Sequence, residues 1–221
     1  MRIKTGVPGL DDLIGGGFVT GSSILVSGSC GTGKTVFGMQ FLWNGLVKGE
    51  PGVYISFEET PREIREDALS LGWNFDAFEN KGMCKISYYD PFEISGANTL
   101  LLEDIRKTNA KRVVIDSVSV FAMHLKDAAR TRKMIYKLIE MLKKTGATII
   151  LLSETLEDSR NFSRFGIEEF IADSVISLNC VEIDGIFSRF LAVRKMRRSN
   201  HTHELHPFEI GKNGLELLGA G

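Results

Sequence analysis

Short apolar runs alternate along the first two thirds of the chain with longer stretches that repeat apolar residues at helical spacing. The apolar runs predict strands over residues 22–27, 53–57, 84–87, 112–116 and 147–153. Helical spacing predicts helices over residues 34–47, 63–71, 99–109 and 130–144. Such alternation is typical of an α/β fold with a mostly parallel central sheet that helices cover on both faces.

The last third of the chain has a different pattern. Residues 173–178, 187–195 and 207–210 read as successive strands with no helix between them. Strands joined directly to one another pair antiparallel, which predicts an antiparallel C-terminal extension of the same sheet. No linker or internal repeat divides the 221 residues, so we expect residues 1–221 to form a single domain.

Composition narrows the class of protein. Hydrophobic residues at 43% and charged residues at 25% are ordinary globular values and exclude a disordered or fibrous chain. A net charge of −1 argues against a strongly cationic nucleic-acid binder. The three cysteines are widely spaced, as in proteins of a reducing compartment, and no apolar run has the length of a membrane span. We therefore expect a cytoplasmic protein without a membrane partner.

A glycine-rich segment lies where the first predicted strand meets the first predicted helix. It has the P-loop, or Walker A, pattern in the strand–loop–helix context that this pattern requires. Glycines let backbone N–H groups point at phosphate oxygens, and the helix N-terminus adds positive charge. Lys34 can reach the outer phosphates, and the Thr35 hydroxyl can bind Mg²⁺. The predicted nucleotide-binding residues are Gly28, Ser29, Cys30, Gly31, Thr32, Gly33, Lys34, Thr35 and Val36.

Acidic residues follow two of the predicted strands. Asp116 ends the most apolar strand of the middle region and is the best second candidate for the Mg²⁺ site. Glu58 and Glu59 follow another strand, and neighbouring carboxylates raise each other's pKa, which suits a base acting on water. We take Glu58 as the first choice; the alternative is a solvated pair at the strand end that caps the next helix. Ser153, at the end of a further strand, is a candidate sensor of the γ-phosphate.

Several motifs along the chain match one family in order and spacing. Beside the P-loop they are residues 5–13 (TGVPGLDDL), 15–17 (GGG), 57–61 (FEETP), 115–118 (IDSV), 195–201 (KMRRSNH) and 207–210 (PFEI). Together they resemble the RecA-like ATPases of the KaiC group over nearly the whole chain.

The resemblance implies more than the residue pattern shows. It implies a RecA-like fold that binds Mg-ATP, releases ADP, and assembles as a homo-oligomer, usually a hexameric ring with ATP between subunits. Glu58 and Glu59 would act on the attacking water, and Ser70 would lie near the nucleotide. A late-strand element would reach the neighbouring subunit's phosphates in trans through Lys195, Met196, Arg197, Ser199 and His201. The alternative for this element is a solvated run of charges on an edge strand.

The chain also departs from the family pattern. Cys30 stands where the family usually has proline, at a position that contributes mainly its backbone, and Arg198 replaces a common glycine. Glu169 and Phe170 occupy the positions of the phosphorylated Ser-Thr pair in the clock protein's kinase domain. Because neither side chain accepts a phosphoryl group from ATP in this way, autokinase activity is not expected.

One further segment has the composition of a nucleic-acid loop. Residues 154–166 lack periodicity and contain Arg160, Phe162, Arg164 and Phe165, types that bind single strands by charge and stacking. Acidic residues in the same segment dilute that charge, which favours a loop that lines a pore without nucleic acid. We therefore expect a nucleotide-controlled oligomeric regulatory module with an unidentified protein partner; the alternative is a DNA-binding recombinase paralogue.

Overall fold

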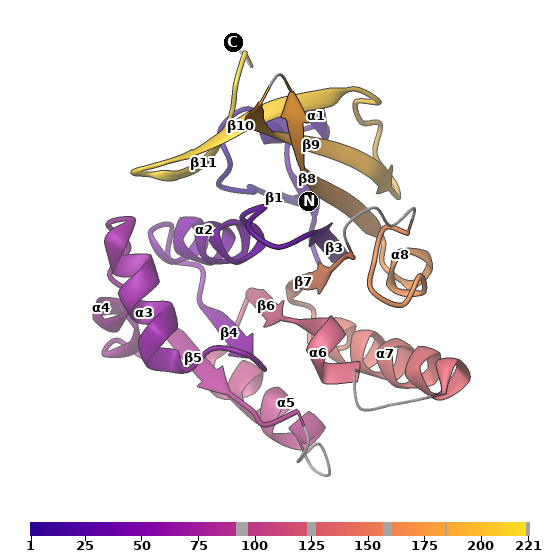
Figure 1. Ribbon diagram of the computed structural model, residues 1–221. Helices are drawn as coiled ribbons and strands as arrows, with labels where there is room; N and C mark the ends of the chain where they lie inside the picture. Colours follow the sequence, from indigo (N-terminus) through magenta and orange to yellow (C-terminus); the bar gives the residue numbers. More distant parts are fainter. Residues whose placement is uncertain (92–96, 123–126, 157–160, 184, 220–221) are drawn as a thin grey trace.

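A twisted sheet of nine strands forms the centre of the computed structural model, which describes residues 1–91, 97–122, 127–156, 161–183 and 185–219 (Figure 1). Its strand order is β11-β10-β9-β8-β3-β7-β6-β4-β5. The six strands from β5 to β8 run parallel, and β9, β10 and β11 continue the sheet antiparallel. The strands are β3 (Ser23–Gly28), β4 (Gly52–Ser56), β5 (Cys84–Tyr88), β6 (Arg112–Asp116), β7 (Thr148–Glu154), β8 (Ser174–Ile183), β9 (Ile186–Met196), β10 (Leu205–Gly211) and β11 (Gly214–Leu217). The predicted α/β fold with an antiparallel extension is confirmed.

Helices cover both faces of the sheet. They are α1 (Leu10–Leu13), α2 (Lys34–Leu46), α3 (Pro61–Ser70), α4 (Asp76–Glu79), α5 (Ala97–Thr108), α6 (Val118–Ala122), α7 (Ala128–Lys143) and α8 (Glu168–Ile171). A small second sheet pairs β1 (Arg2–Ile3) with β2 (Phe18–Val19). Among the described residues, no helix combines the length and the apolar character needed to cross a membrane.

Two hydrophobic cores lie on the two faces of the sheet, because side chains alternate along each strand. In β6, Val114 belongs to the core that α2 covers, whereas Val113 and Ile115 belong to the core of α5 and α7. Every residue of β6 is buried. Strands buried on both faces read as continuous apolar runs, which is why the sequence predicted them well.

β6 begins with a fully buried arginine. The Arg112 guanidinium donates to Glu50 Oε2 at 2.7 Å and to the carbonyl oxygens of Lys4 at 2.9 Å and Phe41 at 2.7 Å. Arg112 thereby joins the N-terminal segment, α2 and the loop before β4.

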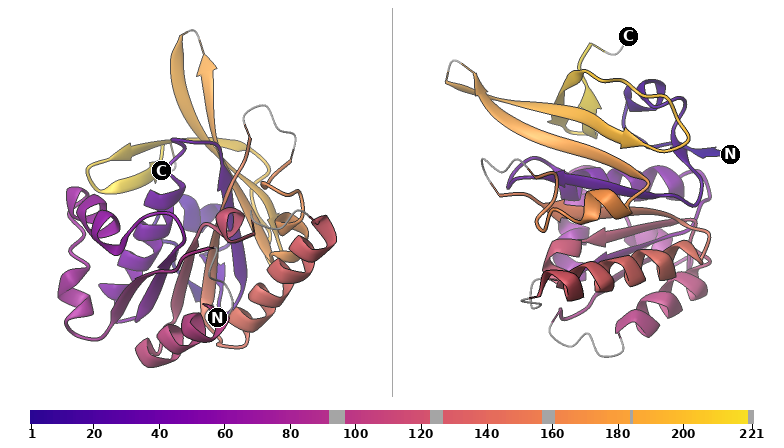
Figure 2. Two further views of the ribbon diagram at one scale, coloured as in Figure 1. Left: turned by 60° about the horizontal axis from the view of Figure 1, so that its bottom comes forward. Right: turned by 90° about the vertical axis from the view of Figure 1, so that its right-hand side faces the viewer.

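The register of β8 and β9 determines which of their residues lie at each end of the sheet. β8 is parallel to β3 and pairs Leu178 with Gly28, the last residue of β3. β9 returns antiparallel and pairs Met196 with Ser174, level with the start of β3. β8 and β9 also continue past the end of β3 as a two-stranded arm, longer than the sequence predicted, which projects from the molecule (Figure 2).

Candidate functional site

The P-loop runs from the end of β3 to the start of α2. Gly31 (φ 72°) and Gly33 (φ 94°) adopt the left-handed backbone conformation that favours glycine. A Cβ atom on Gly28 would lie 2.5 Å from the carbonyl oxygen of Leu178, and one on Gly33 would lie 2.5 Å from Cδ1 of Ile210. The loop can therefore take this path, which ends at the N-terminus of α2, only with glycine at these positions.

Lys34 lies over the P-loop. Its Nζ donates to the carbonyl oxygen of Ser29 at 2.8 Å. The same carbonyl oxygen accepts from Thr32 Oγ1 at 2.9 Å. Burial lowers the pKa of Lys34, while the negative charges of Glu154 and Asp116 oppose this effect. A bound phosphate would offer the Lys34 ammonium a partner of opposite charge in place of the carbonyl group.

Thr35 and Asp116, predicted from distant segments to share a Mg²⁺ site, lie side by side. Thr35 Oγ1 donates to Asp116 Oδ2 at 3.1 Å, and the buried Tyr54 hydroxyl donates to the same oxygen at 2.6 Å. Burial raises the pKa of Asp116, whereas these two hydrogen bonds lower it. A hydroxyl and a carboxylate oxygen this close are donors of the kind that Mg²⁺ prefers. Thr35 and Asp116 thus fit Mg²⁺, which would neutralise phosphate charge there.

Glu58 and Glu59 are fixed at the end of β4. Ser56 Oγ accepts from the backbone N–H of Glu58 at 3.2 Å and of Glu59 at 2.9 Å. Ser117 Oγ donates to Glu58 Oε1 at 2.6 Å. Glu59 Oε2 is buried and accepts no hydrogen bond from any residue that the structure describes. One carboxylate is thus held by a neighbour, and the other keeps a buried oxygen without a hydrogen-bond donor among the described residues.

The pKa values of both glutamates are raised. Burial, and next the charge of Asp116, raises the pKa of Glu59 to about 6; burial is also the main cause for Glu58. Neither glutamate caps the next helix, because Glu63 forms the capping box of α3 with Thr60. This arrangement favours a base that acts on water over a pair that only precedes a helix.

The structure does not bring Ser153 to the P-loop. Its hydroxyl lies 3.2 Å from Glu168 Oε1, on the sheet face away from α2. The next residue, Glu154, has the opposite orientation and exerts the strongest charge effect on the pKa of Lys34. On β7 it is therefore the Glu154 carboxylate whose charge acts on Lys34, whereas the Ser153 hydroxyl is placed beside Glu168. Strand alternation was the signal, because Ile150 and Leu152 belong to the same core as α2.

Arg189 is a site residue that the sequence did not predict. It extends from β9, and its Nε and Nη2 atoms both lie 3.3 Å from the carbonyl oxygen of Gly31. Its side chain is half-buried and adds a cation beside the P-loop. No sequence signal indicated this contact, because it depends on how far the β8–β9 arm extends.

Lys195, Met196 and Arg197 lie at the opposite end of the sheet from the P-loop, level with the start of β3. Lys195 Nζ donates to the carbonyl oxygens of Glu169 at 2.9 Å and Ala172 at 2.6 Å. Arg197 is exposed, and Met196 is buried. A single chain therefore does not bring these cations to its own P-loop.

Asp173 lies beneath this end of β9. It accepts from Ser23 and, at 2.6 Å, from Lys143 Nζ, and Arg197 Nη1 lies 3.8 Å from its Oδ1. Burial alone would raise the pKa of Asp173, but the hydrogen bonds from Lys143 and Ser23 hold it below its usual value. Arg197 is thus held beside a carboxylate that stays ionised.

The remaining residues of the predicted trans element lie after β9. Ser199 Oγ donates to the carbonyl oxygen of Ile14 at 2.8 Å, and His201 Nδ1 lies 2.6 Å from the carbonyl oxygen of Thr202. Both bonds are made within the chain and fix the loop that precedes β10.

Ser70 and Val36 occupy less distinctive positions. Ser70 is exposed at the C-terminal end of α3, where its hydroxyl donates to the carbonyl oxygen of Asp67 at 2.6 Å. Glu59 precedes the other end of this helix, so α3 separates Ser70 from the glutamates. Val36 is partly buried against the core of α2.

The two aromatic side chains of the predicted nucleic-acid loop lie in different surroundings. Phe162 is exposed, with the Arg194 guanidinium 5.0 Å from its ring centroid. Phe165 instead packs against the core of α5 and α7, and the backbone N–H of Arg164 donates to Ser153 Oγ at 3.4 Å. Arg160 lies outside the described residues.

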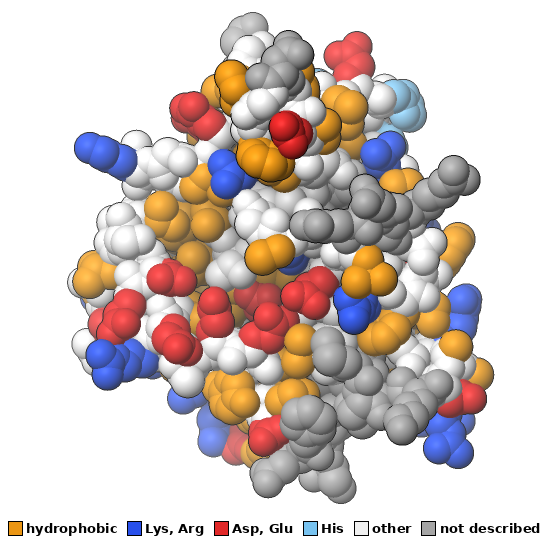
Figure 3. Space-filling model, viewed as in Figure 1, with side chains coloured by type: hydrophobic (Ala, Val, Ile, Leu, Met, Phe, Trp, Pro, Cys, Tyr) orange, Lys and Arg blue, Asp and Glu red, His pale blue; other side chains and the backbone are white. Residues whose placement is uncertain are grey.

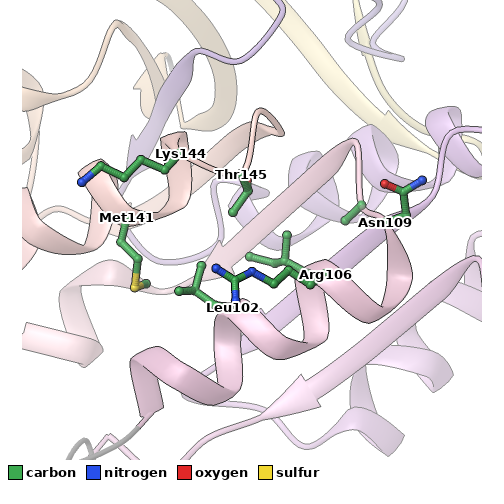
Figure 4. Close-up of a pocket in the computed structure, with 8 residues that line it drawn as sticks. Leu102, Arg106, Asn109, Met141, Lys144 and Thr145 are labelled. Atoms are coloured by element: carbon green, nitrogen blue, oxygen red, sulfur yellow. The ribbon is translucent and has the colours of Figure 1, made fainter.

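A separate hollow lies between α5 and α7 (Figure 4). It has a volume of about 390 Å³, and Leu102 and Met141 contribute apolar side chains to it. Asn109 and Thr145, which precede β6 and β7, place it at the edge of the sheet opposite the P-loop. It is therefore not part of the nucleotide site.

Known proteins resemble this chain over nearly its whole length. The family model described as "ATPase: KaiC" matches residues 3–220. A UPF0273 protein of Pyrococcus horikoshii is 38% identical, with 97% of this chain and 92% of that protein covered. The circadian clock oscillator protein KaiC of Synechococcus elongatus is 34% identical, and the match spans 100% of this chain but 44% of that protein. A crystal structure of a KaiC-like protein from Pyrococcus horikoshii superposes with a TM-score of 0.91 at 39% identity and covers 98% of both chains. The chain therefore belongs to the KaiC family of ATPases.

Proposed function

We propose that this chain binds Mg-ATP and hydrolyses it to ADP and phosphate at a site that a second copy of the chain completes. It would act as a nucleotide-controlled oligomeric regulatory module. The observation that carries the proposal is the meeting of three predicted elements at one end of the sheet. There the P-loop, the Thr35–Asp116 pair and a glutamate with a free buried oxygen lie around the same position.

Each element has a chemical role in hydrolysis. Lys34 and the backbone N–H groups of the P-loop bind the phosphates, and Thr35 with Asp116 would hold Mg²⁺, which neutralises phosphate charge. Water attacks the γ-phosphorus, the bond between that phosphorus and the ADP oxygen breaks, and the water proton passes to a glutamate carboxylate. A raised pKa makes Glu59 a better proton acceptor than an ordinary surface glutamate.

The charges of the two sheet ends support assembly. The P-loop end carries Glu58, Glu59 and Glu154, and acidic side chains gather across the middle of the face in Figure 3. The opposite end carries Lys195 and Arg197. When one copy stacks on the next head to tail, the cations of one meet the acidic site of the other and stabilise phosphate charge in trans. A head-to-tail contact forms a ring when the rotation between copies closes and a filament when it does not, and the family resemblance favours a hexameric ring.

Two other activities are less well supported. A DNA-linked ATPase would need a cationic and aromatic surface, and among the described residues Arg194 with Phe162 favours it. Autokinase activity has no acceptor at the positions of Glu169 and Phe170, and Glu169 accepts a hydrogen bond from Ser163.

Phosphate release from Mg-ATP, measured with and without single-stranded DNA, tests the proposal. Lys34→Ala is expected to lose turnover, and Arg197→Ala to lose about a hundredfold or more while it still folds. Arg198→Ala removes the neighbouring exposed cation and is expected to behave like the parent. Unchanged turnover in Lys34→Ala would refute the site assignment. A normal rate for Arg197→Ala in a verified oligomer would remove the trans role, and stimulation by DNA would favour the alternative.

A further inference from the structure

The tip of the β8–β9 arm carries an exposed apolar surface. Val181 and Ile183 are each 47% exposed, Ile186 is 67% exposed and Phe187 is 72% exposed. Ile183 lies directly opposite Ile186, so Val181, Ile183 and Ile186 share one face of the arm. Phe187 lies on the other face of the arm, together with Arg189, which contacts the P-loop. A cluster of exposed apolar side chains of this kind marks a contact surface.

An apolar groove lies at the base of the same hairpin. It has a volume of about 490 Å³ and is lined by Phe162, Phe170, Val175, Arg194, Lys195 and Arg197, among others. Phe170, from α8, is 64% exposed. The groove thus combines an aromatic surface with three cations and one carboxylate, that of Glu169, and two of the cations are the proposed trans residues.

We propose that the arm tip of one copy packs into this groove of the next copy. The inference rests on the proposed function, because it specifies the contact that would build the shared site. If Arg197 of one copy faces the P-loop of the next, the groove faces that P-loop too. The arm projects from the P-loop end, where Arg189 contacts Gly31, so in this arrangement its tip would meet the groove of the next copy.

Chemistry favours a second copy as the occupant of the groove. The apolar tip matches the exposed rings of Phe162 and Phe170, and burying these surfaces together removes both from water. Glu182, exposed at the tip, carries the charge opposite to that of Arg194, Lys195 and Arg197. The tip would thereby hold the trans cations in register with the neighbouring P-loop.

The contact joins two different surfaces, so each can be disrupted separately. Ile186→Asp damages the tip and leaves the groove intact, whereas Phe170→Asp damages the groove and leaves the tip intact. Leu100→Asp is the matched control, because Leu100 is an exposed apolar residue in the first turn of α5, where an aspartate suits the helix dipole. Circular dichroism establishes that each variant is folded.

Sedimentation velocity with Mg-ATP gives the first result. Ile186→Asp and Phe170→Asp are expected to weaken self-association at least about tenfold, and Leu100→Asp is expected to leave it unchanged. An assembly that survives both tip and groove substitutions while it hydrolyses ATP would overturn this inference and leave the proposed function standing. A parent chain that stays monomeric with Mg-ATP would overturn both, and would assign the tip to a different protein.

Mixing the two variants gives the second result. The intact tip of the Phe170→Asp copy fits the intact groove of the Ile186→Asp copy, so a heterodimer with restored hydrolysis is expected. Adding Lys34→Ala to the Phe170→Asp copy should abolish that activity, because this copy supplies the P-loop at the intact contact. Adding Lys34→Ala to the Ile186→Asp copy instead should leave that activity in place. Absence of any heterodimer would exclude tip-to-groove packing.

Discussion

Replacing Glu59 by glutamine is expected to stabilise the free protein at neutral pH while slowing hydrolysis. The pKa of Glu59 is raised from its usual 4.5 to about 6, so the folded state binds this proton more tightly than the unfolded state does. Ionising Glu59 in the folded protein lowers the free energy of unfolding. This loss is absent below pH 4.5, grows as the pH rises, and is complete above pH 6. Glutamine resembles the protonated side chain and does not ionise.

The magnitude follows from the pKa values. A pKa difference of about 1.5 corresponds to about 2 kcal/mol, and solvent screening of a partly exposed side chain reduces this to about 1 kcal/mol. For a domain of this size, about 1 kcal/mol raises the thermal midpoint by about 2–4 °C. The gain should fall to less than half by pH 5, because Glu59 in the parent is by then largely protonated.

Thermal unfolding without nucleotide or Mg²⁺, at pH 7.5 and pH 5, measures this difference. Glu63→Gln is the control of opposite sign, since hydrogen bonds from the Thr60 backbone and hydroxyl lower the pKa of Glu63. Ionised Glu63 therefore adds stability that is lost as the pH falls. A Glu59→Gln protein that is no more stable than the parent at pH 7.5, or that gains the same stability at pH 5, would contradict a raised pKa of Glu59.

Three further substitutions test separate parts of the structure. Tyr54→Phe removes the hydroxyl that donates to Asp116 Oδ2. We expect the Mg²⁺ concentration for half-maximal hydrolysis to rise at least about tenfold. An unchanged Mg²⁺ titration would contradict the role of Tyr54 in positioning Asp116. Gly33→Ala places a Cβ atom 2.5 Å from Ile210 Cδ1 at a φ of 94°, so it should cost about 1–2 kcal/mol in urea unfolding and weaken ATP binding by calorimetry. Arg112→Leu leaves Glu50 and the carbonyl oxygens of Lys4 and Phe41 without their hydrogen-bond donor, and should lower the free energy of unfolding by about 3 kcal/mol. A thermal midpoint within about 2–3 °C of the parent would show that the buried guanidinium contributes little.

The sequence predicted the parts of the fold that bury side chains on both faces. β6 has the predicted bounds, and α2 and α7 end within one residue of theirs. The β8–β9 arm was underestimated, because its outer residues face water on both sides and carry no burial pattern. The helices α1, α4, α6 and α8 span four or five residues each, too few to show helical periodicity.

Strand ends account for most of what could be predicted of the site. In a parallel sheet the carboxyl ends of strands meet at one edge, so the P-loop, Asp116 and Glu59 could be grouped from sequence. The choice between Ser153 and Glu154 depends on strand phase, which the sequence also contains but which the prediction did not use. Arg189 could not be found in this way, because a hairpin of unknown length brings it back to Gly31.

A site divided between two ends of one sheet has a kinetic consequence. Arg197 lies level with the start of β3, about 16 Å of strand away from the P-loop at its other end. If hydrolysis needs both the P-loop and an Arg197 side chain beside it, a single chain lacks a complete site. The rate per chain then depends on how much of the protein is assembled. Dilution should therefore lower the turnover number in parallel with the loss of oligomer, and Arg197→Ala should abolish that concentration dependence together with most of the rate. A turnover number that stays constant through the dilution range in which sedimentation shows monomers would establish that one copy suffices.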